Sequence, residues 1–159
     1  MAMTLVSTVT VPSTGQTDTI TWSDIPQTGK DLLLLGSGRD NNGRLFFRVN
    51  GEASNQFTVR RLLGDGSTTS SGTFTSLTVV LSRTDTTANT FGNFAITISN
   101  YTSNNSKAIS VDVVTENNAT GANQMLAAAS TNTTSPITSL SIDQTIFSPN
   151  SSFSLYIIS

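Results

Sequence analysis

The chain has 159 residues and a net charge of −2, and it contains neither cysteine nor histidine. Catalytic triads and metal sites that need either residue are therefore excluded. Only 11% of the residues are charged, whereas threonine, serine and asparagine together make up 64 of the 159. Serine, threonine and asparagine are mediocre helix formers, and threonine suits strand faces, so the composition favours a β-rich binding or structural protein.

The length predicts one domain over residues 1–159, in which residues 1–4 form a loose N-terminal end. A chain of this size buries about 68–70% of its unfolded surface and needs no disulfide or metal to fold. No apolar stretch approaches the ~18 residues of a membrane span, and the N-terminus lacks the pattern of a signal peptide. With a pI of about 4.8 and no basic patch, we predict no nucleic-acid partner and no membrane partner.

In the first half of the chain, short segments in which apolar and polar residues alternate are separated by turns. Leu5 to Val11 and Ile20 to Trp22 predict two strands. In residues 31–38, apolar residues occupy both odd and even positions, which is typical of a central strand covered on both faces. A turn at residues 40–43 precedes a strand at 44–49, and Asn50-Gly51 is the strongest hairpin signal in the chain.

The second half continues in the same style. A strand from Phe57 to Leu63 leads into a predicted loop at 64–72, followed by a strand at 74–81 and a polar loop at 85–92. Further strands are predicted at 94–99, 109–113, 140–142 and 153–158. Residues 124–129 suit a strand or a short helix, and we favour a strand because both flanks are strands. The pattern predicts an all-β, two-sheet β-sandwich, jelly-roll-like, with about ten short antiparallel strands.

Few residues suggest a catalytic or metal-binding role. Serines are abundant, but no histidine activates one, and Lys30 and Lys107 both flank turns. The acids are scattered, and the Asp40 and Asp65 loops are expected to form Asx-turns rather than calcium sites. We therefore predict no enzyme, no catalytic residue, no cofactor and no metal. If Trp22 and Tyr101 faced solvent, a sugar-stacking platform would be the alternative.

Short patterns spread over nearly the whole chain carry a family resemblance. They lie at residues 25–28, 36–39, 49–51, 62–67, 87–91, 98–103, 116–120 and 151–157. Each alone is a common turn or strand pattern, and their order along the chain makes the match more specific. The sequence resembles small virion proteins of tailed bacteriophages of the cyanophage and marine type. In that family the last strand usually reads Ser-x-x-x-Leu-Tyr-Gly-Ile, and here Ile157 stands where glycine is common.

The resemblance implies a non-enzymatic β-sandwich on the phage particle. Two places are open: the head, as a decoration or cement protein, and the tail, as a fibre or receptor-binding module. We favour the head, because the predicted sandwich fills the chain from Leu5 to Ile158 and leaves no shaft segment. The resemblance further implies a homotrimer, with the chain itself and the major capsid protein as partners. The expected location is the outer capsid surface of the virion, after synthesis in the host cytoplasm.

The long polar loops are the candidate contacts with the shell. They contribute Gly64, Asp65, Gly66, Ser67, Asp85, Thr87 and Asn89. A carbohydrate-binding module is the alternative from another class, and its test is the exposure of Trp22 and Tyr101. A glycosidase is a third hypothesis, and it requires two carboxyl side chains within about 5–10 Å of each other.

Overall fold

Thirteen strands form two sheets in the computed structural model, which describes residues 2–13, 18–53, 55–83, 87–115, 122–143 and 146–159. The described residues contain no helix, and none therefore is long and apolar enough to cross a membrane. The strands are β1 (Met3–Thr10), β2 (Thr19–Trp22), β3 (Asp31–Asp40), β4 (Arg44–Val49), β5 (Phe57–Gly64), β6 (Thr69–Phe74), β7 (Thr78–Val80), β8 (Ser82–Arg83), β9 (Gly92–Ile98), β10 (Ala108–Val114), β11 (Gln124–Thr131), β12 (Leu140–Asp143) and β13 (Ser152–Ile158).

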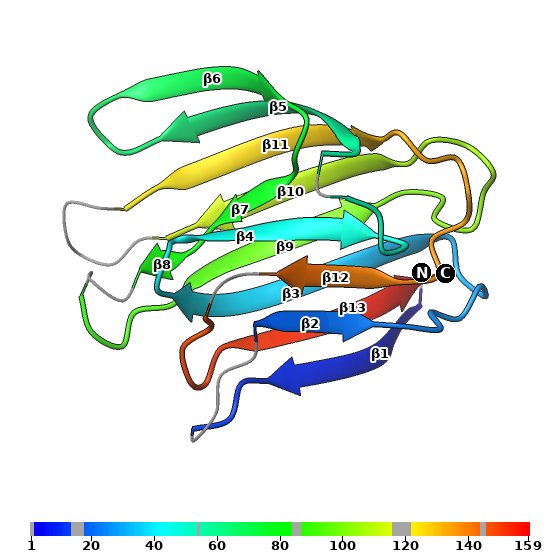
Figure 1. Ribbon diagram of the computed structural model, residues 1–159, viewed down its shortest axis with the longest axis horizontal. Helices are drawn as coiled ribbons and strands as arrows, with labels where there is room; N and C mark the ends of the chain where they lie inside the picture. Colours follow the sequence, from blue (N-terminus) through cyan, green and yellow to red (C-terminus); the bar gives the residue numbers. More distant parts are fainter. Residues whose placement is uncertain (1, 14–17, 54, 84–86, 116–121, 144–145) are drawn as a thin grey trace.

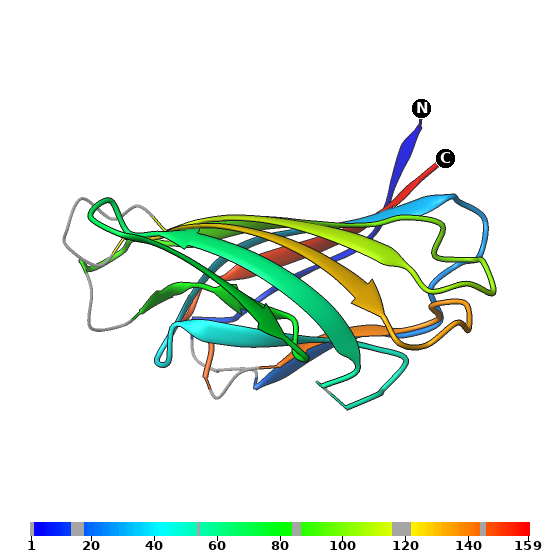
Figure 2. The same ribbon diagram turned by 90° about the horizontal axis from the view of Figure 1, so that it is seen from above.

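The two sheets differ in width and face each other as layers (Figure 1). The long sheet has the order β1-β13-β3-β9-β10-β11-β5-β6, and β8 pairs with the end of β3. The short sheet has the order β2-β12-β4-β7. Figure 2 shows the layers from the side, with the β5–β6 side of the long sheet curling toward the short one. This curl brings Phe57 of β5 against Phe47 of β4, with ring centroids 6.1 Å apart.

The chain crosses between the layers at its beginning and at its end. β1, β3 and β13 lie in the long sheet, while β2, β4 and β12 lie in the short one. The last two strands are inserted between earlier ones: β13 between β1 and β3, and β12 between β2 and β4. The predicted all-β sandwich is thus confirmed, whereas its jelly-roll form stays a prediction.

Alternation of apolar and polar residues places one face of each strand in a shared core. In β10, Ile109, Val111 and Val113 are buried while the residues between them are exposed. β9 and β13 repeat this pattern, and Phe153 of β13 contacts Phe147 with ring centroids 5.1 Å apart. Burial of the apolar inner face is the main stabilising contribution to such a fold.

The strand count and two local predictions are corrected by the structure. Thirteen strands replace about ten, partly because the segment predicted as a loop at 64–72 includes the first four residues of β6, which pairs with β5. This strand was missed because its residues are mostly small and polar and show no apolar alternation. The single strand predicted at 74–81 is divided between β6 in one sheet and β7 in the other.

Asn50-Gly51 forms the expected turn but not the expected hairpin. Both residues have positive φ, of 50° and 68°, and the Glu52 amide donates to the Val49 carbonyl at 2.9 Å. However, β4 and β5 belong to different sheets, so the turn redirects the chain from one layer to the other. Asn50 also receives a hydrogen bond from the Thr138 amide at 2.9 Å and donates to the Pro136 carbonyl at 2.9 Å.

The remaining strand predictions hold in part. Residues 124–129 lie in β11, which confirms the strand. Met3 and Thr4, expected in a loose end, pair with Ile158 and Ile157 of β13. β3 is central, as expected, but only its inner face is fully covered: Leu32 and Leu34 are buried, whereas Leu33 is half-buried and Leu35 is 37% exposed.

Lys107 follows a turn, as expected, but it is buried rather than exposed. Its ammonium donates to the carbonyls of Asn105, Thr134 and Ser135, the latter two at 3.0 Å. Burial lowers the pKa of Lys107. The side chain thereby joins the β9–β10 connection to the segment that follows β11.

Replacing Lys107 with methionine should therefore destabilise the fold. The three carbonyls would lose their donor, and we expect a loss of about 1–3 kcal/mol in the free energy of unfolding, measured by urea denaturation. Lys30→Met, at an exposed lysine, is the matched control and should change stability by less than about 0.5 kcal/mol. Equal effects of both substitutions would show that the buried contacts contribute nothing.

Candidate functional site

The predicted contact loops lie together at one end of the sandwich. The β3–β4 turn, the β5–β6 turn and the connection before β9 share the end opposite the two termini (Figures 1 and 2). The register agrees, because Gly64 pairs with Gln124, Gln124 with Val114, and Val114 with Asn93 in one row across four strands. We call this region, comprising residues 40–43, 64–68 and 87–91, the loop end. Asp85 lies outside the described residues.

The β5–β6 turn is organised around the carboxylate of Asp65. Its Oδ1 accepts hydrogen bonds from the backbone amides of Ser67 at 3.0 Å and Thr68 at 2.6 Å, and the hydroxyls of both residues also donate to the carboxylate. These donors favour the ionised form and hold the pKa of Asp65 well below its usual range. Gly66 has a φ of +85°, a conformation that glycine adopts without strain. The turn is thus a closed Asx structure, as the sequence suggested.

Arg39 fixes the loop that precedes β9. This side chain is only 7% exposed, and its Nη1 donates to the carbonyls of Thr87 at 2.7 Å and Thr90 at 3.0 Å. Within the loop, Asn89 has a φ of 61°. The sequence did not single out Arg39 for this task, since its position at a strand end carries no signal for burial.

The third part of the loop end is the turn after β3. Asp40 is fully buried and accepts hydrogen bonds from the backbone amides of Asn42 and Gly43. The Oδ1 atom of Asp40 thus organises the turn, in line with the Asx-turn expected from the sequence. Beside Gly64 and Asp65, a shallow cavity of about 390 Å³ is lined also by Val114, Asn123 and Gln124.

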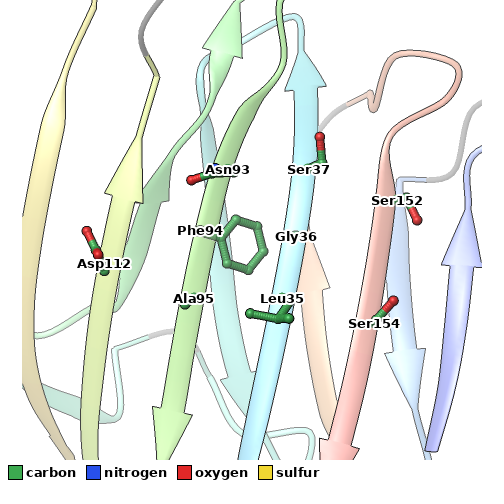
Figure 3. A pocket seen from close by; sticks show the side chains of 9 residues that line it. All are labelled: Leu35, Gly36, Ser37, Asn93, Phe94, Ala95, Asp112, Ser152 and Ser154. Carbon is green, nitrogen blue, oxygen red and sulfur yellow. The ribbon is translucent and has the colours of Figure 1, made fainter. Parts of the chain in front are cut away.

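A second exposed surface is the outer side of the long sheet, which we call the open face. It consists of the outward side chains of β1, β13, β3, β9, β10, β11, β5 and β6. Near its centre lies a shallow cavity of about 440 Å³, whose lining includes Leu35, Asn93, Asp112 and Ser154 (Figure 3). Small hydroxyl and alanine side chains form the rest of its outward lining, so it offers hydrogen bonds and modest apolar contact.

The open face was not recognised as a site from the sequence. The sequence did contain an indication of it, because residues 31–38 have apolar residues at both odd and even positions. The structure buries only one side of this strand, β3. Similar exposed apolar residues occur at Leu62 and Leu126, which are paired neighbours on β5 and β11.

The alternatives based on sugars receive no support from these positions. Trp22 is 3% exposed and Tyr101 is fully buried, so both are core residues. On the open face, Asp112 and Asp31 are separated by two strands and four residue positions, or about 16 Å. This exceeds the separation of a glycosidase carboxylate pair.

No group of three or more potential metal-binding side chains occurs among the residues that the structure describes. No protein-family model matches the sequence, and a search of curated proteins returned no match.

Substituting Arg39 should loosen the loop before β9. In Arg39→Ala, the Thr87 and Thr90 carbonyls lose a charged donor, so we expect a loss of about 1–3 kcal/mol in the free energy of unfolding. Hydrogen exchange of the Thr90 amide should also accelerate. Arg44→Ala, at an exposed arginine, should do neither, and unchanged exchange in Arg39→Ala would contradict the assignment.

Asp65→Asn should weaken the β5–β6 turn in a pH-dependent way. Because the pKa of Asp65 is lower in the folded state, its ionised carboxylate stabilises the fold fully above the unfolded pKa of about 3.9. That contribution is lost as the pH falls from there through the folded pKa. Thermal melts should therefore separate wild type from the variant at neutral pH and converge in strong acid. A difference that stays constant with pH would refute the charge-based account.

Proposed function

We propose that this protein is a structural protein of a tailed-phage particle, which binds the outer surface of the head as a homotrimer and bridges capsid subunits. The observation that carries the proposal is the loop end: polar turns, held by Asp65 and Arg39, project together from one end of a sandwich. The sequence resemblance to small phage virion proteins supplies the biological setting.

The chemistry of the loop end suits a docking role. Its exposed residues, such as Ser67, Thr87 and Asn89, offer hydroxyl and amide groups that exchange hydrogen bonds with a partner. Asp65 is the charged group in the turn, and its carboxylate is already engaged by the turn itself. Such groups are desolvated at lower cost than free charges.

Internal hydrogen bonding also reduces the entropy lost on docking, because the loops are ordered before they meet a partner. In a trimer, three loop ends would touch neighbouring capsid subunits at once. Each weak contact then raises the effective concentration of the others. Bridging of this kind would stabilise the shell against heat or internal pressure.

The direct test is to add the purified protein to heads that lack it and to measure DNA release on heating. We expect binding and a higher release temperature. Thr87→Glu at the loop end should weaken binding, whereas Thr28→Glu, an exposed position beside the opposite end, should not. Failure to bind heads, together with antibody labelling of the tail tip, would favour a receptor-binding module instead.

A further inference from the structure

Exposed apolar side chains gather on the open face. Among the described residues, seven large hydrophobic side chains are exposed, and the strand registers place six of them on this face. The six are Met3, Leu5, Leu35, Leu62, Val114 and Leu126. Phe74, the seventh, lies on the other side of the sheet, where Arg61 stacks on its ring at 4.3 Å.

β3 has the composition of a strand covered on both sides. Its inner leucines are buried in the core, yet Leu35 is 37% exposed and Leu33 is half-buried. Near-continuous apolar runs are typical of strands with both faces covered. The described residues of the single chain leave the outer side of β3 partly exposed.

The open face is chemically compatible with a copy of itself. Its charged side chains are Asp31, Asp112 and Arg60, so two such faces would bring little like-charge repulsion. Hydroxyls dominate the rest, and a hydroxyl both donates and accepts, so it pairs with an identical group. The outer side of the short sheet is more highly charged, because Arg44, Arg48 and Asp143 all lie on it and this sheet has only a few outward positions.

The extent of the open face matches that of a stable interface. Eight strands spaced about 4.8 Å apart span about 34 Å, and seven residues along a strand span about 23 Å. The product is on the order of 800 Å² for the whole face, so a contact that leaves out the curled β5–β6 side still covers most of the area that each partner buries in a standard protein–protein interface. Stacking of sheet on sheet is also an established packing mode.

We propose that the open face is the surface through which copies of this chain bind one another. The proposal deepens the self-association in the proposed function and rests on it, but it does not depend on attachment to a phage head. It assigns separate surfaces to the two kinds of contact: the open face to other copies, and the loop end to the shell.

The test is light scattering of the full chain and of two matched variants at high micromolar concentration. Thr97 lies at the centre of the open face, on β9 between Ser110 and Leu33, whereas Thr21 is exposed on the short sheet. Wild type should have a mass of three times 16.8 kDa, as expected for the homotrimer of the proposed function. Thr97→Glu should weaken association by about tenfold or more, because it buries unpaired like charges. Thr21→Glu should not.

Circular dichroism and thermal melts will show whether the variants fold, and Leu126→Glu, at a residue that is 48% exposed, provides a second probe of the same face. If Thr97→Glu does not fold, the mass of Leu126→Glu decides.

A monomeric wild type, unchanged assembly of the folded face variants, or equal dissociation of Thr21→Glu would overturn the proposal. If wild type is a trimer that the face variants do not disrupt, the proposed function stands, and only the assignment of self-association to the open face is wrong. A dimer that they disrupt would support the face and contradict the homotrimer.

Discussion

Insertion of the last strand between the first and third is the constraint on which the structure depends. β13 pairs with β1 on one side and β3 on the other, so a strand more than a hundred positions away in the chain joins the edge strand β1 to the rest of the long sheet. The chain must be nearly whole before this contact forms, and such non-local pairing is slow to form. Gly36 permits the packing beneath it, because a Cβ there would lie 2.3 Å from the Phe94 ring and 2.9 Å from that of Phe153. Without β13 the edge strand β1 would be cut off from the rest of the open face, and the hydrogen bond from the Ser151 hydroxyl to the Arg39 carbonyl, beside the loop end, would be lost.

Two of the eight cationic side chains, those of Arg39 and Lys107, hold loops by their carbonyls. Arg39 and Lys107 are both buried, and the hydrogen bonds described for their side chains end mostly on backbone oxygens of neighbouring loops. Loop carbonyls lack the ladder partners of a strand, and an unpaired buried carbonyl is costly. A charged donor satisfies several of them at once. In a chain with only 11% charged residues, these bonds anchor the loops at Thr87 and Thr90 and at Thr134 and Ser135, whereas Arg48 forms an ion pair with Asp143 at 2.6 Å.

Sequence patterns predicted the features that repeat and missed those that depend on distant partners. The alternation in β9 and β10 identified both strands and their buried faces, and the Asx-turn at Asp65 followed from residue type alone. The hairpin expected at Asn50-Gly51 was wrong because a turn's conformation does not reveal which sheet the next strand joins. The polar strand β6 was invisible because its stability comes from pairing with β5, not from an apolar face. Burial of Lys107 could not be foreseen, since its three acceptors come from segments before and after it in the chain.

The two candidate surfaces are compatible because they point in different directions. The open face is the broad side of the long sheet, whereas the loop end projects along the strands (Figures 1 and 2). In the proposed assembly, copies that associate through their open faces would leave every loop end free and would hold the loop ends in a fixed relative position. Self-association would then supply the multivalency on which weak, polar loop contacts depend for useful affinity.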